Sequence, residues 1–271
     1  MFEKIIKING KEKGPISIIF AGVHGNEKCG VKAFQKIIPN LKIEKGTVLL
    51  GYGNPNAIKT NQRFTEANLN RMFKDDNLLS IIDKNSYEYK RAQFLKTYLN
   101  QSDALLDIHA STNPKSKPFV ICEPNAKKIT QYLPINTVVY GFDKVEPGGT
   151  DYYMNSIGKI GICVECGYFE DIQSAQTAED CIFSFLKACG HITKNIVLKK
   201  QSTIQMYELY MTKTNRFILS KPFADFEEMS KGQLVGKDGE QKITVKKNSI
   251  ILFAKDRTKI GEEGFLLGEK I

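Results

Sequence analysis

The feature that most constrains this chain is the alternation of short apolar runs with helical patterns, from its first residues to about residue 195. Each apolar run is strand-sized and continuous, which is typical of strands that helices cover on both faces. This order predicts a layered α/β sheet. We expect strands at residues 16–23, 47–52, 104–108, 119–122, 137–140 and 160–165, and helices at residues 27–38, 86–99, 125–132 and 172–189.

The sequence changes its character after about residue 195. Short runs of alternating polarity are separated there by Lys-Gly, Asp-Gly and Lys-Asn pairs, which are turn signals between strands. We therefore expect two domains, an α/β domain of residues 1–195 and a small all-β domain of residues 196–271. The strands of the second domain are expected at residues 203–210, 216–219, 242–245, 249–253 and 265–267.

Charge and hydropathy exclude several classes of protein. The net charge of +9 is carried by lysines scattered along the chain, without the Arg-rich tail, zinc-finger spacing or aromatic-basic pattern of nucleic-acid-binding proteins. The longest apolar runs are far shorter than the roughly 18 residues of a membrane span, and the first residues lack the apolar region of a signal peptide. We therefore expect a cytoplasmic protein that binds neither nucleic acid nor membranes.

Two of the three histidines follow apolar strands. His24 comes directly after the run at 16–23 and opens the sequence His-Gly-Asn-Glu, which ends at Glu27 as a helical pattern begins. His109 follows the run at 104–108. Ligands in open α/β sheets bind outside the carboxyl ends of strands, and two histidines with one glutamate are the ligands of a catalytic zinc. Either histidine alone is better explained as a cap on a neighbouring loop, but the combination with Glu27 favours a metal site.

Glu165 ends another apolar run, where a carboxylate is costly unless it has a partner or a chemical task. Beside a zinc site it could take a proton from an attacking water and return that proton to a leaving amine. The alternative is a structural role as a helix cap or in an ion pair. The residues alone leave both interpretations open.

A long polar segment at residues 52–77 contains two of the five arginines, Arg63 and Arg71, and Asn70 beside the second. Loops of this length in a compact domain are usually functional. An arginine next to an asparagine is suited to a carboxylate, which the guanidinium binds with two parallel hydrogen bonds. An arginine near a zinc site can stabilise the oxyanion of an attacked carbonyl. The alternative is a loop held together by arginine bonds to backbone carbonyls.

The chain resembles the succinylglutamate desuccinylase/aspartoacylase family, of the zinc carboxypeptidase superfamily, in an ordered set of short motifs. The set covers about residues 16–190, and the resemblance rests on the order of the motifs rather than on any one of them. It implies a carboxypeptidase-like mixed sheet with helices on both faces, followed by the β domain. The motifs are His-Gly-Asn-Glu at 24–27, Asn-Pro at 54–55, Arg-x6-Asn-Arg at 63–71, Asp-x-His at 107–109 and Glu-Cys-Gly at 165–167.

The resemblance also implies what the motif residues do. It implies one zinc ion per chain, with His24, Glu27 and His109 as ligands, and Glu165 as the general base and general acid.

For the loop residues, the resemblance implies that Arg63 polarises the scissile carbonyl and that Asn70 and Arg71 hold a carboxylate of the substrate. Aspartoacylases use a further arginine, shortly before the catalytic glutamate, to bind the carboxylate of the acyl chain. The corresponding span at residues 142–164 contains two lysines and no arginine. The resemblance therefore does not extend to a particular acyl group.

The activity implied is zinc-dependent hydrolysis of the amide bond in an N-acyl amino acid or a similar small carboxylate. One alternative is a zinc carboxypeptidase that acts on peptides, and another is a metal-binding protein without turnover. A β domain that overhangs the cleft would narrow it and favour small substrates. The complete set of ligands, arginine and glutamate argues against an idle site. The sequence is compatible with an oligomer.

Overall fold

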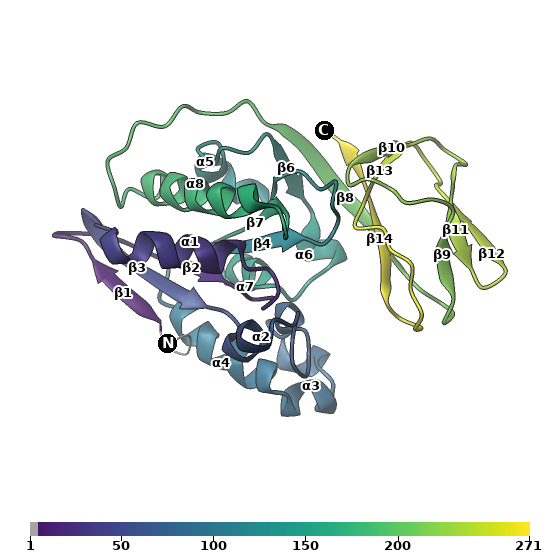
Figure 1. The fold of residues 1–271 in the computed structure, drawn as a ribbon, viewed down its shortest axis with the longest axis horizontal. Coiled ribbons are helices and arrows are strands. Elements are labelled where there is room, and N and C mark those ends of the chain that lie inside the picture. The colour runs from purple at the N-terminus through teal and green to yellow at the C-terminus, as the bar shows by residue number, and fades with distance from the viewer. Residues whose placement is uncertain (1–4) are drawn as a thin grey trace.

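The computed structural model describes residues 5–271. Within these residues the main element is an eleven-stranded mixed sheet, which runs across the whole molecule (Figure 1). Every strand expected in the α/β part is present. In spatial order, the strands are β1 (Ile6–Asn9), β3 (Lys45–Tyr52), β2 (Glu12–Ala21), β4 (Ala104–Ser111), β7 (Ile160–Tyr168), β5 (Phe119–Cys122), β6 (Thr137–Tyr140), β8 (Ser202–Met211), β14 (Glu263–Lys270), β13 (Ser249–Leu252) and β10 (Glu227–Met229).

The part of the sheet that carries the site is parallel. β2 pairs in parallel with β3 and with β4, and β4 pairs in parallel with β7. β5 then runs antiparallel to β7 on its other side. The carboxyl ends of β2, β4 and β7 therefore lie at the same end of the sheet, where ligand sites of α/β proteins form.

Helices cover both faces of the sheet, because side chains alternate between the faces along each strand. Ile19 and Ala21 of β2 pack on the face covered by α1 and α8, whereas Ile18 and Phe20 pack on the face covered by α4. Figure 1 shows α1 and α8 together on one side and α4 on the other. The helices are α1 (Cys29–Ile37), α2 (Pro55–Thr60), α3 (Ile81–Asn85), α4 (Tyr87–Leu99), α5 (Lys127–Thr130), α6 (Phe142–Val145), α7 (Thr150–Ser156) and α8 (Ile172–Ala188).

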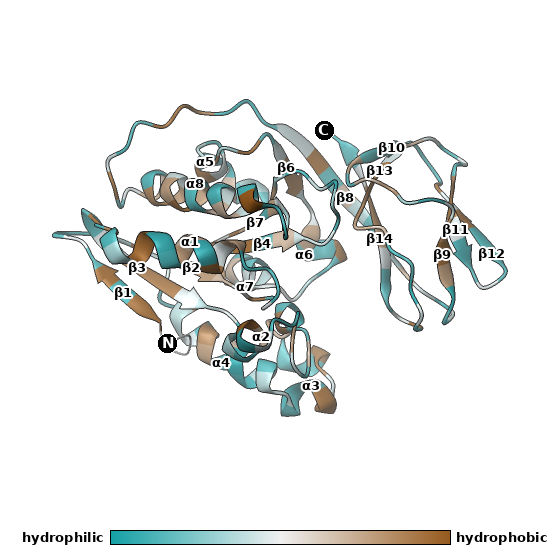
Figure 2. Ribbon diagram, viewed as in Figure 1, coloured by the Kyte–Doolittle hydropathy of each residue, from teal (hydrophilic) through white to brown (hydrophobic). Residues whose placement is uncertain are grey.

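β8 connects the α/β part with the C-terminal part. It pairs in parallel with β6 and antiparallel with β14, so one sheet continues through both (Figure 1). A second sheet of β9 (Phe217–Leu219), β11 (Leu234–Asp238) and β12 (Gln241–Thr244) packs against it, and Figure 2 shows hydrophobic residues along β9 and β11. The division into domains at residue 195 stays a prediction, and β8, which lies beyond that point, hydrogen-bonds to both parts.

Four expected boundaries near the site are wrong. β2 ends at Ala21 rather than at residue 23, so two residues separate it from His24. α1 begins at Cys29 rather than at residue 27, so Glu27 lies in the preceding turn, where its N–H donates to the carbonyl of His24 at 3.2 Å. β4 continues to Ser111 and β7 continues to Tyr168. Strand pairing is made by the backbone and does not require the apolar side chains that mark a strand in the sequence. His109 therefore lies within β4 rather than directly after it, and Glu165 lies inside β7 rather than at its end.

Other differences lie farther from the ligands. The helix expected at residues 125–132 is reduced to α5 and a preceding 3-10 turn. Neither β1 nor α7 was expected from the sequence. Within residues 5–271, no helix is both long and apolar enough to cross a membrane.

Candidate active site

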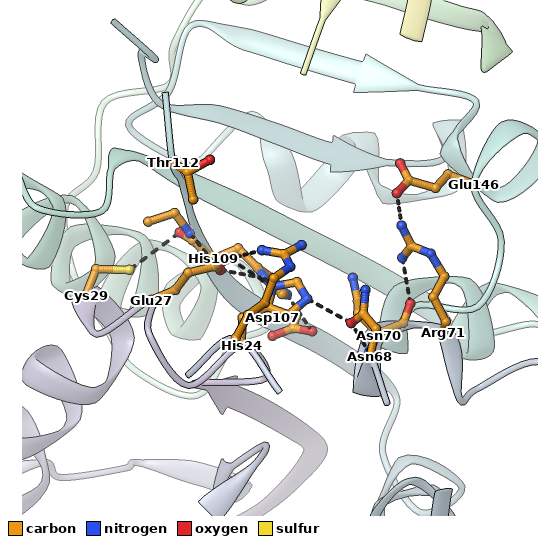
Figure 3. A network of polar contacts seen from close by, with 12 residues as sticks. His24, Glu27, Cys29, Asn68, Asn70, Arg71, Asp107, His109, Thr112 and Glu146 are labelled. Carbon is orange, nitrogen blue, oxygen red and sulfur yellow. Dashed lines mark hydrogen bonds and ion pairs between the residues drawn. The ribbon is translucent and has the colours of Figure 1, made fainter. Parts of the chain in front are cut away.

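Three buried side chains meet at the carboxyl end of the parallel strands (Figure 3). His24 and Glu27 lie in the turn between β2 and α1, and His109 lies on β4. Nδ1 of His24 is 2.9 Å from Oε1 of Glu27, and Nδ1 of His109 is 3.0 Å from Oε2. The two Nδ1 atoms are 3.2 Å apart. The expected cluster is therefore formed, and its ligand atoms face one another.

The turn that carries two of these residues depends on a glycine. Gly25 packs so closely on α2 that a Cβ atom at this position would lie 2.0 Å from the carbonyl carbon of Ala57. Its N–H also donates to the carbonyl of Arg63 at 3.3 Å. Because only glycine permits this approach, the turn is held against α2 and the long loop, which directs His24 and Glu27 toward the same point.

Asn68 determines which nitrogen of His24 carries the proton. Its Oδ1 accepts the N–H of Asn70 at 3.1 Å, so the atom that lies 3.0 Å from His24 Nε2 is the amide oxygen. Nε2 must therefore donate, and Nδ1 of the neutral ring is unprotonated. Burial lowers the pKa of His24 to about 4, so the ring is neutral at pH 7. An unprotonated nitrogen that faces the carboxylate of Glu27 fits a cation between them.

His109 is supported by an aspartate on its own strand. Oδ2 of Asp107 lies 3.2 Å from Nε2 of His109, within ion-pair distance although not aligned as a hydrogen bond, and it accepts the hydroxyl of Thr150. Burial alone would lower the pKa of His109, but the charges of Asp107 and Glu27 outweigh burial and raise it well above its usual value. Burial likewise opposes ionisation of Glu27, but the two histidines hold its pKa well below the usual range. A cation bound among the three residues would displace the proton from His109.

Glu165 lies opposite His109 across the paired strands β7 and β4. Its side chain is buried, and its Oε2 has no hydrogen-bond partner among residues 5–271. Burial and the neighbouring charge of Glu27 raise the pKa of Glu165 to about 8. In the described part of the chain it neither caps a helix nor forms an ion pair, so the structural alternatives lose their support. A carboxyl group with a raised pKa beside the cluster is suited to proton transfer.

The two loop arginines have different partners. Arg63 donates from Nη1 to Oε1 of Glu27 at 2.8 Å, and its side chain is 45% exposed. Arg71 donates from Nε and Nη2 to Oε1 of Glu263 at 3.1 and 2.8 Å, and its Nη2 also contacts Glu146. Figure 3 shows the guanidinium of Arg71 turned toward Glu146. Arg63 is thus positioned beside the cluster, whereas Arg71 is held by two carboxylates.

One pocket brings all the expected site residues together, although their individual roles stay predictions. The pocket is also lined by several residues that the sequence did not indicate. Those from the C-terminal part reach the pocket only through the pairing of β8 with β14, for which the sequence carries no local signal. The acidic residues before and within α7 are visible in the sequence but show no motif. The expected residues are His24, Glu27, Arg63, Asn70, Arg71, His109 and Glu165; the additional polar residues include Asp143, Glu146, Asp151, Lys255, Arg257 and Glu263.

The fold and the site together define an α/β protein with a His-Glu-His cluster that can hold a metal ion at the carboxyl end of its sheet. The family described as succinylglutamate desuccinylase/aspartoacylase catalytic domain matches residues 13–188. The chain belongs to this family, which confirms the resemblance drawn from the motifs.

Individual relatives agree with this assignment. The chain is 26% identical over 208 residues to a probable aspartoacylase of Nostoc sp., a match that covers 70% of this chain and 69% of that protein. It is 29% identical over 173 residues to N-acyl-aromatic-L-amino acid amidohydrolase (carboxylate-forming) B of Danio rerio, over 55% of this chain and 53% of that protein. The crystal structure of a succinylglutamate desuccinylase from Vibrio parahaemolyticus has a TM-score of 0.80 at 17% identity, over 98% of this chain and 86% of that one. This likeness confirms the expected fold class.

Proposed function

We propose that this protein is a zinc-dependent hydrolase that cleaves the amide bond of an N-acyl amino acid. The observation that carries the proposal is the buried cluster of His24, Glu27 and His109 next to Glu165, whose carboxyl group has a raised pKa and no partner for one oxygen. The relatives named above are deacylases of small N-acyl amino acids, which supports the same class of substrate.

The residues fit one zinc ion per chain. Nδ1 of His24, Nδ1 of His109 and the carboxylate of Glu27 are the ligand atoms, and three protein ligands are the usual number in a catalytic zinc site. A zinc ion held there supplies Lewis acidity, which polarises the substrate carbonyl and makes water a stronger acid. Asn68 and Asp107 orient the two histidines through their outer nitrogens.

The chain's own residues perform the proton transfers. Glu165 takes the proton from the attacking water and later delivers it to the nitrogen of the leaving amine, which must leave as a neutral group. Arg63 donates to the carbonyl oxygen as negative charge develops there. Because Arg63 already contacts Glu27, it needs no large movement to do so.

Asn70 and Arg71 hold the carboxylate of the substrate in this proposal. Glu146 and Glu263 occupy the guanidinium of Arg71 at present, so a substrate carboxylate must replace at least one of these contacts. Phe253 and other residues of the C-terminal part line one wall of the pocket. This wall limits the room for a substrate and therefore favours small substrates over peptides. Assembly into an oligomer and a cytoplasmic location stay predictions.

A panel of substrates tests the proposal. The zinc-loaded protein is incubated with N-acetyl and N-succinyl amino acids and with peptides of three to five residues, and the release of free amine is measured. We expect turnover of at least one small N-acyl amino acid and much slower turnover of the peptides. Turnover of peptides alone would establish the carboxypeptidase instead, and no turnover of any compound would contradict the proposal.

A further inference from the structure

The carboxylates and the cations that line the pocket are only partly paired with one another. The lining includes six carboxylate side chains and four from lysine or arginine. Two of the four are already paired, Arg63 with Glu27 and Arg71 with both Glu146 and Glu263. The carboxylates are Glu27, Asp143, Glu146, Asp151, Glu165 and Glu263, and the cations are Arg63, Arg71, Lys255 and Arg257.

Besides Glu165, which the proposed function uses for proton transfer, Asp151 and Asp143 are the lining carboxylates that no lysine, arginine or histidine pairs with among residues 5–271. Asp151 as a residue is only 8% exposed, and within residues 5–271 no lysine, arginine or histidine forms an ion pair with it. Asp143 accepts one hydrogen bond, from Nδ2 of Asn155 at 2.9 Å. Burial and the charge of Asp143 raise the pKa of Asp151 to about 7. Burying a carboxylate without a cation costs folding free energy, and such groups are concentrated at sites that bind a ligand.

A second unsatisfied oxygen lies next to Asp151. Oδ1 of Asn70 is buried and has no hydrogen-bond partner in the described part of the chain. Gly149 lies between the two groups: a Cβ atom built there would be 2.4 Å from Oδ1 of Asp151 and 3.1 Å from Oδ1 of Asn70. Two acceptors therefore flank one backbone position in the wall of the pocket: a carboxylate that has no ion-pair partner and an amide oxygen that has no donor among residues 5–271.

The remaining cations lie on the C-terminal part. Lys255 contacts the hydroxyl of Thr112, and Arg257 donates to the backbone carbonyl of Glu263. Neither forms an ion pair with a carboxylate among residues 5–271. The pocket thus offers unpaired positive groups on its C-terminal wall and unpaired negative groups beside Gly149. The positive groups would bind a substrate that carries two carboxylates, but the negative groups beside Gly149 would repel it.

We infer that the substrate carries an ammonium group in addition to its carboxylate, and that Asp151, Asp143 and the amide oxygen of Asn70 receive this ammonium group. The inference rests on the proposed function and specifies its substrate class. An ammonium group has three donors in a compact head, which suits several oxygens around one point. The group has two sources: the side chain of a diamino acid acylated on its α-nitrogen, or the free amino terminus of a dipeptide.

Matched substrate pairs test the inference with the full-length, zinc-loaded protein. Nα-acetyl-L-ornithine is compared with Nα-acetyl-L-norleucine, which replaces the ammonium group by a methyl group. Glycyl-L-norleucine is compared with N-propionyl-L-norleucine in the same way. In one of the pairs, we expect kcat/KM to be at least about tenfold higher for the ammonium compound than for its neutral partner. A tenfold ratio corresponds to the free energy of a single charge-assisted hydrogen bond. The pair that shows the ratio identifies the source.

Variants assign the effect to Asp151. Asp151→Asn should remove the advantage of the ammonium compound while changing kcat/KM for its neutral partner by less than about threefold. The control Asp180→Asn makes the same change on the exposed surface of α8 and should leave the ratio as in the wild type. The inference is overturned if neutral compounds are preferred in both pairs, or if the preference survives in a folded Asp151→Asn protein.

A binding measurement separates this inference from the proposed function. L-Ornithine is compared with L-norleucine, and glycine with propionate, by calorimetric titration into the zinc-loaded protein, which requires no turnover. Each pair differs by one ammonium group in place of a methyl group. If no compound is hydrolysed, the proposed function fails, but selective binding of L-ornithine over L-norleucine, or of glycine over propionate, that Asp151→Asn abolishes would still support the acidic subsite. Equal binding of the two compounds within both pairs would overturn it.

Discussion

Glu27 and Glu165 are both buried carboxylates in one pocket, yet their surroundings move their pKa values in opposite directions. Burial disfavours the charge of each. Two histidines outweigh burial at Glu27 and hold its pKa well below the usual range, whereas the charge of Glu27 adds to burial and raises the pKa of Glu165 to about 8. In the proposed mechanism, the separated pKa values divide the tasks of metal ligand and proton carrier between these two carboxylates.

Replacing Glu165 tests this division. Glu165→Gln should retain zinc and fold but lose turnover by about 10²–10⁴-fold, because an amide of the same shape cannot take up the proton. The zinc content and kcat of the purified variant are measured. The control Glu240→Gln changes an exposed glutamate far from the pocket and should be fully active. Wild-type turnover in Glu165→Gln would mean that Glu165 is structural.

Asp107 is expected to act through His109. It lies 3.2 Å from the outer nitrogen of that ring and is held by the hydroxyl of Thr150. Asp107→Ala should therefore weaken zinc binding by about 10–100-fold without abolishing it. Competition with a chelator of known affinity measures the change. An unchanged affinity would show that the carboxylate does not orient the ligand.

The His-Glu-His cluster was predictable from the sequence, because strand ends, a His-x-x-Glu spacing and a second strand-associated histidine are local features. The partners of Arg71 were not. Glu263 lies 192 residues farther along the chain, and only the tertiary fold brings it to the loop. The same holds for Asp151, whose lack of a cation is a property of the assembled pocket rather than of any motif.

At the scale of elements, the long loop between β3 and α4 is organised by the first turn of α4. The carboxylate of Glu88, which is fully buried, accepts from the side chain of Asn54 at 3.0 Å and from the N–H of Thr65 at 2.8 Å. It also accepts from the N–H groups of Glu66 and Ala67 at 3.2 and 3.1 Å. These bonds fix the segment that leads from Arg63 to Arg71. The sequence indicated a functional loop but not the residue that holds it.

Removing the charge of Glu88 should loosen this loop. Glu88→Gln replaces one acceptor oxygen by an NH2 group that faces backbone donors, so we expect a loss of about 2–4 kcal/mol in the free energy of unfolding. Urea denaturation measures the loss, with Glu240→Gln as the control. A change below about 0.5 kcal/mol, the range of ordinary surface substitutions, would contradict the role given to Glu88.

His191 joins three elements at the opposite end of the sheet. It follows α8, its Nδ1 donates to the carbonyl of Lys45 at 2.8 Å, and its Nε2 accepts from the hydroxyl of Ser17 at 2.8 Å. Burial lowers its pKa below the usual value. Below about pH 6.5 the unfolded chain therefore binds a proton that the folded chain resists, and stability falls as the pH decreases.

The variant His191→Gln retains a donor and an acceptor but cannot take up this proton. Its free energy of unfolding should fall less steeply between pH 7 and pH 5 than that of the wild type, by at most about 1.4 kcal/mol per pH unit. Urea denaturation at three pH values gives the comparison. Parallel pH profiles for the two proteins would show that His191 does not contribute to the pH dependence.

At the scale of the whole molecule, the pocket has walls from both parts of one continuous sheet. β8 carries the chain from the α/β part to the C-terminal part, and the contact of Arg71 with Glu263 joins the two beside the cluster. Alternating apolar runs predicted the layers and the order of the elements. They could not predict that β8 pairs on both sides, because pairing between distant strands leaves no periodic signal in either.

The central claim is that His24, Glu27 and His109 hold a catalytic zinc ion. Metal analysis of the purified protein, together with His24→Ala and His109→Ala, tests it most directly, since each variant removes one of three ligands. We predict about one zinc ion per chain in the wild type and its loss in both variants, with loss of amide hydrolysis in parallel. Wild-type zinc content in both variants would contradict the claim.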